Sequence, residues 1–571
     1  MRKTAILRIR LITGLVLGLA LILLVRLYFI QIVHHEQYVE AANKQYVHTV
    51  NDLYERGNIF FVTLDGEKVS AATIRAGYVL AVNPTLVVDA ATLYNSLQPY
   101  LSIGKELFID RATLESRTYV EIEDKLDNDD AIEVSKLNLT GVSLYKNQWR
   151  YYPGETMAAR TIGFTGLTQK SDKPTGRYGL ERFYESTLNQ GENTIEVNLF
   201  AEIFSNIENL VFQHQEDKAG DIVTTLEPTV SRVLQQTLQE THTTWNSKVT
   251  GGIIINPKTG AIYALDAVPT FDLNNRNGVP IEDFRNPLVE NVYEFGSIIK
   301  PLTMASGIDD RAVSSYTTYY DAGQIKLDDY TISNYDGRGR GTVDMQEVLN
   351  QSLNTGVAFV VQQMGKTKFR DYFLALGLGT LTNIDLPNEA TGLVSNLHSP
   401  RDVEYVTASF GQGIALTPVA AVRALSSLAN GGKLITPHLV ERIEYQDGTR
   451  TQIEQGAPET IFAEETSEEI SRMLTVVVDD ALRDGIHKQE RYSVAAKTGT
   501  AQIADEENGG YYDDRYLHSF FGYFPSYDPE FLIFLYTVEP KEIRYASETL
   551  TEPFMDLTNF LINYYQIPPD R

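Results

Sequence analysis

The chain has 571 residues, which is more than one hydrophobic core usually serves, so its length predicts at least two domains. It contains no cysteine, which excludes disulfides and cysteine-ligated metal sites. With 75 acidic and 49 basic residues the net charge is −26, so the attraction to phosphate that nucleic-acid binding needs is missing. Nucleic acid is therefore excluded as a partner. The absence of an HExxH motif, a Walker loop or a dinucleotide fingerprint predicts no metal and no cofactor.

The first forty residues predict a membrane anchor. Four basic residues within residues 1–10 precede an apolar stretch at 11–33, which is interrupted by Arg26. A span needs about twenty residues, so 11–33 is long enough if the stem of Arg26 reaches the headgroups. The basic flank predicts a cytoplasmic N-terminus and an extracytoplasmic remainder. A cleaved signal peptide is the alternative, but the small-residue site Val39-Glu-Ala41 lies far beyond the run, which favours an uncleaved, single-pass anchor in the cell membrane.

Beyond the anchor the chain divides into two parts. Residues 34–218 are rich in charge and in short β-prone runs, and 199–219 reads as a helix with a polar linker. The second part, 219–571, carries stronger periodic signals, which predict an antiparallel sheet covered by helices on both faces in an α+β (mixed α/β) fold. In chain order these signals predict a helix at 228–240, a hairpin at 251–268, a helix from Ser297 through Ile308, a small-residue helix within 405–429, strands at 493–500, 517–524 and 531–538, and a closing helix at 553–565.

Three short strings in the second part carry the groups needed for nucleophilic catalysis. Each string alone has a simpler interpretation as a helix cap, a solvated hydroxyl or a turn, and a serine with a lysine three positions on occurs about once by chance in a chain this long. Their order and joint presence make the set informative. The strings are Ser297-Ile-Ile-Lys300, Ser352-Leu-Asn354 and Lys497-Thr-Gly499.

The first string predicts a nucleophile with its base. A serine hydroxyl is a poor nucleophile until a base removes its proton. At the start of a helix, residues i and i+3 share one face, so Lys300 is expected beside the Ser297 hydroxyl. Lysine acts as a base only when neutral, which burial and a second cation promote, and Lys497 can be that cation. Ser352 is predicted to relay a proton, and Asn354 to bind both Lys300 and the substrate.

The third string predicts a binding edge for a peptide. It ends an apolar strand in small and hydroxylated residues. Gly499 has no side chain, so a substrate peptide can lie close against the strand. A peptide that pairs with this edge leaves Lys497, Thr498 and Thr500 to hold its terminal carboxylate.

Together the strings form the S-x-x-K, S-x-N and K-T-G set of serine acyl-transferases that act on D-Ala-D-Ala peptides and penicillins. The chain therefore resembles the penicillin-binding proteins, and in particular the class B, monofunctional transpeptidases. The segment at 61–66 departs from the family's usual Asp-Arg-Asn-Gly, and Phe295 stands where the family has proline. Further strings resemble the family's non-catalytic pedestal and its boxes: Arg56-Gly-Asn-Ile59, Arg150-Tyr-Tyr-Pro153, Gly179-Leu-Glu181 and Ser409-Phe-Gly-Gln-Gly413.

The resemblance implies an architecture and a reaction. It implies an anchor at 11–33, a β-rich, dimerisation-like pedestal at 34–218, and a transpeptidase domain at 219–571 with a five-stranded antiparallel sheet. Ser297 would attack the penultimate D-alanine of a stem peptide while backbone N–H groups of Ser297 and Thr500 hold the oxyanion. An amine from a second stem peptide would then resolve the acyl-enzyme into a cross-link. β-Lactams, which mimic D-Ala-D-Ala, would trap the same serine.

The resemblance also implies partners and leaves alternatives open. No glycosyltransferase string occurs between residues 34 and 220, so a membrane-embedded SEDS-type glycosyltransferase is expected as a partner, together with division or elongation proteins. The spacing of Ala42 and Gln45 after the anchor favours the septal, cell-division type. The alternatives are a D,D-carboxypeptidase or β-lactamase-like hydrolase that uses water as acceptor, a β-lactam sensor, and a non-catalytic division scaffold.

Overall fold

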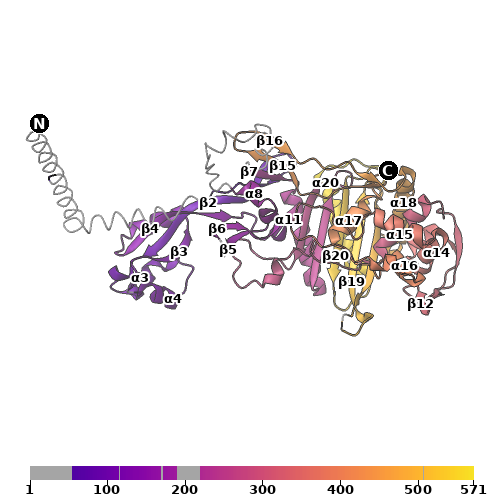
Figure 1. The fold of residues 1–571 in the computed structure, drawn as a ribbon, viewed down its shortest axis with the longest axis horizontal. Coiled ribbons are helices and arrows are strands. Elements are labelled where there is room, and N and C mark those ends of the chain that lie inside the picture. The colour runs from indigo at the N-terminus through magenta and orange to yellow at the C-terminus, as the bar shows by residue number, and fades with distance from the viewer. Residues whose placement is uncertain (1–17, 19–54, 115, 169–170, 190–218, 506) are drawn as a thin grey trace, which may run out of the picture. The chain divides into compact units, whose positions relative to one another are not determined.

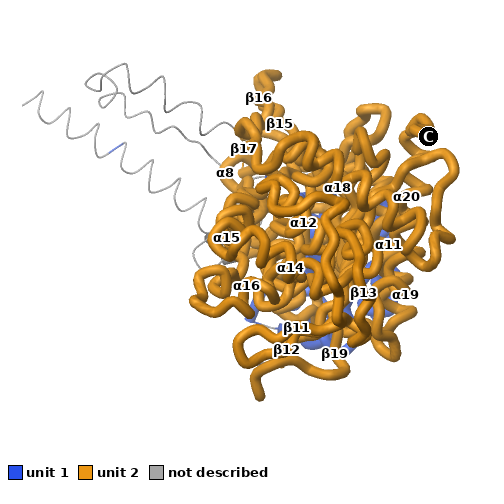
Figure 2. The backbone as a smooth tube through the Cα atoms, turned by 90° about the vertical axis from the view of Figure 1, so that its right-hand side faces the viewer, with its two compact units in different colours: residues 1–55, 74–149 blue, residues 56–73, 150–571 orange. Residues whose placement is uncertain are grey.

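The computed structural model describes Gly18 and residues 55–114, 116–168, 171–189, 219–505 and 507–571 (Figure 1). Apart from Gly18, the predicted anchor at 11–33 lies outside the described residues, as does the stretch 199–218. None of the helices within the described ranges combines the length and the apolar character that a membrane span requires. The described chain forms two compact units (Figure 2), one containing 74–149 and the other containing 56–73 and 150–571. The predicted domain boundary between residues 218 and 219 stays a prediction.

The smaller unit is a three-stranded sheet with helices packed against it. Strands β3 and β4 both pair with β2, and β3 pairs with its second half. Leu80 and Val82 of β2 belong to the same buried cluster as Leu97 and Phe108 from the helices, which gives this unit a core of its own. Its elements are β2 (Lys68–Val82), η2 (Pro84–Leu86), α3 (Ala90–Leu97), η3 (Gln98–Tyr100), α4 (Lys105–Ala112), β3 (Val120–Leu126), α5 (Asn128–Lys136) and β4 (Val142–Tyr151).

The larger unit begins with a sheet that joins distant parts of the sequence. The first half of β2 continues this sheet in the order β16-β15-β7-β1-β2, in which β1 and β7 are parallel and the other pairs antiparallel. Beside it lie a small hairpin and three short helices. These elements are β1 (Ile59–Val62), α6 (Ala159–Ile162), β5 (Thr165–Thr168), β6 (Ser171–Gly176), α7 (Gly179–Phe183), α8 (Glu185–Leu188), β7 (Gly220–Thr224), β15 (Val440–Tyr445) and β16 (Arg450–Gln452).

The three pedestal-like strings of the sequence meet in one buried ion-pair cluster. The carboxylate of Glu181 accepts from Arg56 Nε at 2.6 Å and from Arg150 Nε at 2.6 Å, and all three side chains are almost fully buried. The hydroxyl of Tyr152 lies 3.3 Å from the same carboxylate. Burial alone would raise the pKa of Glu181, but the charges of Arg150 and Arg56 outweigh it and hold this pKa below its ordinary value. The cluster ties segments 125 residues apart into one core.

A five-stranded antiparallel sheet forms the centre of the larger unit, as the sequence predicts. Its strand order is β18-β19-β20-β8-β9, and each neighbouring pair is antiparallel. The hairpin between β8 and β9 turns at Asn256, whose side chain accepts the N–H groups of Lys258 and Thr259. The strands are β8 (Val249–Ile255), β9 (Ile262–Val268), β18 (Ala495–Ala504), β19 (Tyr511–Phe524) and β20 (Phe531–Val538).

Helices cover both faces of this sheet, which confirms the layered prediction. On one face α11 (Pro228–Trp245) and α20 (Thr551–Tyr564) share a core with the strands, and the ring of Phe520 stacks on Phe554 at 4.5 Å (Figure 1). On the other face lie α12 (Lys300–Asp309), α17 (Pro418–Ser426) and α18 (Glu464–Val476), packed in the larger core with Phe521 and Phe534. The burial of both faces explains why β20 has no polar side.

The predicted helix from Ser297 starts one turn later than expected. Residues Gly296–Ile299 form a 3₁₀ turn, η5, and α12 begins at Lys300. The cause is Pro301, which has no N–H to donate to the carbonyl of Ser297 four residues before it. That carbonyl accepts instead from the N–H of Lys300, three residues on, which is the 3₁₀ pattern.

The remaining elements complete the larger unit. Two small hairpins, β10 with β13 and β11 with β12, precede the helices that carry the second string. In chain order these elements are η4 (Ile281–Phe284), β10 (Thr318–Asp321), β11 (Gln324–Leu327), β12 (Tyr330–Ser333), β13 (Gly341–Asp344), α13 (Met345–Asn350), α14 (Asn354–Met364), α15 (Lys366–Ala375), η6 (Ser395–His398), α16 (Asp402–Ser409), β14 (Lys433–Leu434), β17 (Glu459–Thr460), η7 (Val477–Ala481), η8 (Leu482–Gly485) and α19 (Ala546–Thr549).

Candidate active site

The turn that carries Ser297 packs directly against strand β18, and glycines make this approach possible. A Cβ on Gly499 would lie 2.4 Å from the carbonyl oxygen of Phe295 and 2.4 Å from Ser519 Oγ. Ser519 donates its hydroxyl to the same Phe295 carbonyl at 2.7 Å. A Cβ on Gly296, whose φ is +66°, would lie 2.8 Å from a carbonyl of β18. Gly499 therefore has a packing role besides the access for substrate that the sequence suggests.

Lys300 lies fully buried beside Ser352. Its Nζ donates to the carbonyl oxygen of Ser352 and lies 3.2 Å from the hydroxyl of the same residue. Ser352 adopts a left-handed backbone conformation with φ +53°, which is uncommon for a residue with a side chain and is typical of functional sites. It stands two residues before α14, so the chain turns here between two helices and presents both oxygens of Ser352 to Lys300.

The electrostatics of the site favour a neutral amine on Lys300. Burial, followed by the charge of Lys497, lowers the pKa of Lys300 well below its ordinary value. Burial also lowers the pKa of Lys497 to about 7. A neutral lysine amine has two N–H bonds and one lone pair. If both N–H groups donate to the two oxygens of Ser352, the lone pair stays available to accept a proton from another hydroxyl. Lys300 can thus act as a general base without a histidine.

Strand β18 offers an open edge to the site. It is the terminal strand of its sheet and pairs on one side with β19. Nζ of Lys497 donates to the carbonyl of Thr498 at 3.0 Å. The hydroxyl of Thr500 accepts from the N–H of Ala546 at 3.0 Å, which ties α19 to the strand. An extended peptide can therefore add to the free edge of β18 and place its end near these residues.

One cavity of about 760 Å³ joins the three strings. Six of the eight residues predicted for the site line it: Ser297, Ser352, Asn354, Lys497, Thr498 and Thr500. Of the other two, Lys300 lies beneath the cavity in contact with Ser352, and Gly499 is buried in β18. The amide of Asn354 donates to the carbonyl of Ser333 at 2.8 Å, and its predicted bond to Lys300 stays a prediction.

Sequence reasoning missed most of the cavity rim. The rings of Tyr335 and Tyr545 meet edge to face at 6.1 Å, and both line the cavity with Arg544. These residues lie in loops without periodicity or motif, so no local signal could have identified them. Phe410 and Gln412 also line the cavity, and for these the box at 409–413 was the available signal.

The two lysines predict a bell-shaped pH dependence for acylation. If Lys300 is the base and Lys497 holds the substrate carboxylate, as the sequence predicts, the acylation rate rises with pH as Lys300 loses its proton and falls as Lys497 loses its own near pH 7. The measurement is the second-order rate constant for acylation by benzylpenicillin from about pH 5 to pH 9. In Lys497→Arg the second cation stays charged, and the alkaline limb is expected to disappear. A wild-type rate that climbs steadily to pH 9 would contradict this assignment.

Comparison with known proteins agrees with this geometry. A family model described as the penicillin binding protein transpeptidase domain matches residues 250–558, and one described as the penicillin-binding protein dimerisation domain matches residues 54–225. Stage V sporulation protein D of Bacillus subtilis is 28% identical over 567 residues, covering 96% of this chain and 84% of the relative. The peptidoglycan D,D-transpeptidase FtsI of Buchnera aphidicola is 22% identical, and the match covers 99% of this chain and 96% of that relative.

The fold is also shared with a solved structure. Penicillin binding protein 2X from Streptococcus thermophilus superposes with a TM-score of 0.70 at 21% sequence identity, covering 90% of this chain and 80% of that chain. At this identity the likeness concerns the fold. The transpeptidase model alone spans more than half of the sequence, and the pedestal model adjoins it. The chain belongs to the class B penicillin-binding proteins.

Proposed function

We propose that the chain is a peptidoglycan D,D-transpeptidase that cross-links stem peptides through an acyl-enzyme on Ser297. The observation that carries the proposal is the buried Lys300, whose lowered pKa favours the neutral amine and whose Nζ contacts Ser352 of the cavity that Ser297 also lines. A buried lysine with a strongly lowered pKa is typical of a catalytic site, and its contact with the Ser352 hydroxyl supports the assignment of Lys300 as the base.

The proposed reaction has two acyl-transfer steps. Ser297 Oγ attacks the carbonyl of the penultimate D-alanine, and its proton passes to Nζ of Lys300. Backbone N–H groups of Ser297 and Thr500 hold the oxyanion, a stabilisation of the kind that costs about 3 kcal/mol when one donor is lost. The C–N bond breaks as a proton reaches the departing D-alanine through Ser352. An amine of a second stem peptide then attacks the ester, gives up its proton along the same route and releases Ser297.

The binding groups of the cavity suit the donor peptide. The terminal carboxylate is assigned to Lys497, Thr498 and Thr500, since an ammonium and two hydroxyls at one strand end match an anion. The free edge of β18 supplies backbone hydrogen bonds to an extended peptide. β-Lactams present the same carboxylate and a strained amide, so they acylate the same serine. Asn354 is assigned to the peptide amide of the substrate.

The proposal is tested by mass and by product. Full-length protein incubated with benzylpenicillin is expected to gain one covalent adduct, located on Ser297, and Ser297→Ala is expected to gain none. Supplied with a donor ending in D-Ala-D-Ala and an amine acceptor, the wild-type protein is expected to form a cross-linked product. Release of D-alanine without that product would favour the hydrolase alternative. An unchanged mass after long incubation would count against any serine acyl-transferase, and growth supported by Ser297→Ala would favour the scaffold.

The cellular setting is part of the proposal. The basic, apolar N-terminus supports a single-pass anchor at 11–33 with the catalytic part outside the cell membrane. The likeness to a protein named FtsI and the spacing of Ala42 and Gln45 support a septal role, and the missing glycosyltransferase string supports a SEDS-type polymerising partner. Labelling with a fluorescent penicillin in dividing cells is expected to mark the septum. Uniform labelling along the side wall would favour an elongation role.

A further inference from the structure

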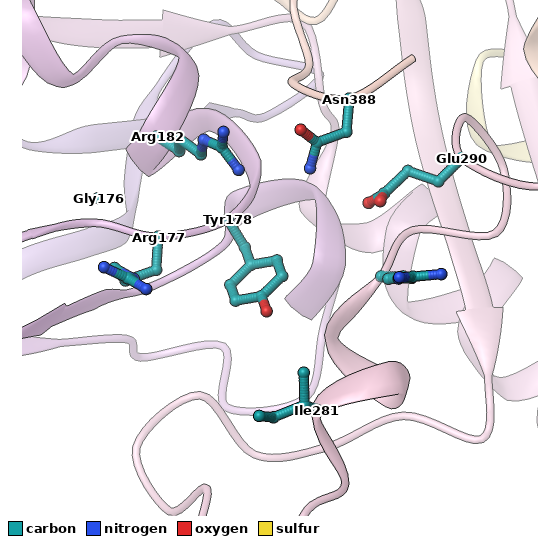
Figure 3. A pocket seen from close by; sticks show the side chains of 8 residues that line it. Gly176, Arg177, Tyr178, Arg182, Ile281, Glu290 and Asn388 are labelled. Carbon is teal, nitrogen blue, oxygen red and sulfur yellow. The ribbon is translucent and has the colours of Figure 1, made fainter. Parts of the chain in front are cut away.

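A second cavity, of about 620 Å³, gathers three arginines in the larger unit. Figure 3 shows Arg177 and Arg182 on one side of the cavity and Glu290 and Asn388 on the other, with the ring of Tyr178 between them. Arg285 completes the set. No lining residue is shared with the cavity that holds Ser297. The mechanism proposed above therefore makes no use of this place.

The three arginines that line this cavity have no carboxylate partner among the described residues. Within the part of the chain that the structure describes, the side chains of Arg177, Arg182 and Arg285 form no ion pair and no hydrogen bond. The one acid of the lining, Glu290, uses its Oε1 to accept the N–H of Asn286 at 2.9 Å. Acidic residues outnumber basic ones in this chain, 75 to 49, so three arginines without an acidic partner are not expected to line the same cavity by chance.

The backbone that lines this cavity is held in place by packed aromatic side chains. The ring of Tyr178 packs on Phe164 at 5.0 Å and on Phe284 at 5.5 Å, and the backbone N–H of Arg177 donates to the carbonyl of Phe164. Arg182 lies in α7, directly after the buried Glu181. The backbones that carry the arginines are thus held by a packed core, which reduces the ordering that a ligand would have to impose.

We propose that this cavity binds a ligand with two or more oxyanions, phosphates or carboxylates, held by Arg177, Arg182 and Arg285. A planar guanidinium presents paired N–H donors that match the two oxygens of a carboxylate or phosphate. The opposite side, with Glu290 and Asn388, accepts and donates hydrogen bonds, so it orients a hydroxyl or amide of the same ligand. This site goes beyond the transpeptidase function and does not depend on it.

The arrangement itself gives the physical reason for expecting a ligand. Arg177, Arg182 and Arg285 are exposed to solvent, which weakens the repulsion between their like charges but does not remove it. Three cations at one cavity that form no ion pair in an acid-rich chain are free to bind an anion. Removing two of the charges should therefore leave the ligand-free protein as stable or more stable, whereas arginines that support the fold would give the opposite result.

The test compares full-length protein in detergent with two probes, pyrophosphate and citrate, at constant ionic strength. Either probe at about 10 mM is expected to raise the unfolding temperature of the wild-type protein in a saturable way. Arg182→Gln/Arg285→Gln is expected to unfold at the same or a higher temperature without a probe, and to need about tenfold more probe for the same shift. The control Arg117→Gln/Arg232→Gln removes two exposed arginines elsewhere and is expected to keep the wild-type response.

The outcomes separate this site from the catalytic one. A response to pyrophosphate alone assigns a phosphate ligand, and a response to citrate alone assigns a carboxylate ligand. The absence of any saturable shift, an equal shift in the Arg182→Gln/Arg285→Gln variant, or a lower unfolding temperature of that variant without a probe would each overturn the proposal. Penicillin labelling of the same variant is expected to match the wild type, so a failed transpeptidase assignment and a failed anion site would be told apart.

Discussion

Lys300→Met is expected to slow acylation by benzylpenicillin by about 100- to 10,000-fold, the contribution usual for a general base. Methionine fills a similar volume but cannot accept the proton of Ser297. The substitution also removes the hydrogen bond that Nζ of Lys300 donates to the carbonyl of Ser352, so the free energy of unfolding is expected to fall by about 1 kcal/mol, which leaves the protein folded. The measurement is the rate of appearance of the acyl-enzyme by intact mass, with the unfolding temperature of the variant recorded beside it.

A matched control shows whether the effect belongs to this lysine. Lys433 is exposed on strand β14, and Lys433→Met is expected to acylate at the wild-type rate. If Lys300→Met also reacts at the wild-type rate, Lys300 is not the base and the mechanism fails at its first step. If its unfolding temperature falls sharply, the loss of rate would reflect the fold. A stable, slow variant is the expected result.

Glu181→Ala is expected to lower the free energy of unfolding by about 3 to 5 kcal/mol, the cost of breaking a buried ion pair by removing one partner. The substitution leaves both arginines buried, and each loses its 2.6 Å contact with Glu181. Arg56 keeps an ion pair with Glu185 at 2.7 Å, so the loss falls mainly on Arg150. Two nitrogens of Arg150 already lack a hydrogen-bond partner, so they cannot supply an alternative. Denaturant unfolding of the larger unit, followed by tyrosine fluorescence, measures the loss.

Two further variants test the charge argument for Glu181. Glu181→Gln keeps the shape and a carbonyl acceptor but not the charge, so an intermediate loss is expected. Asp528→Ala removes an acid from an exposed pair with Lys258 in the same unit and is expected to change stability by less than about 0.5 kcal/mol. A loss for Glu181→Ala as small as that for Asp528→Ala would show that the buried cluster does not stabilise the unit.

Some features of the fold follow from local patterns. The apolar runs at 517–524 and 531–538 became neighbouring strands of the five-stranded sheet, because period and length identify a strand wherever it is placed. The helix at 228–240 was recognisable from its stripe of apolar residues, and α11 contains it. The start of α12 was read wrongly at Ser297, although Pro301 in the sequence gives the signal that the first turn cannot be α-helical.

The convergence of the site depends on contacts between distant segments. The three sequence motifs identified the hydroxyls and amines of the site. They could not show that these groups meet, because Lys300 lies 52 residues from Ser352, whose hydroxyl it contacts. Gly499 is required because β18 packs against the turn at Phe295, a contact that the sequence does not reveal. Tyr335 and Tyr545, which line the cavity, lie in loops without a periodic pattern. Close approach of backbones is a property of packing, which a linear pattern does not contain.

By itself, the sequence determined the family, the chemical groups, and the strands and main helices of the central sheet, because these depend on residue type and short-range spacing. The tertiary structure alone decided that Lys300 is fully buried, that Ser352 turns in a left-handed conformation towards it, and that three arginines share a cavity. Burial and the approach of like charges change a pKa by removing water and adding a field. Burial and the distance between like charges depend on which segments fold against each other, so the pKa of Lys300 cannot be obtained from the sequence pattern alone.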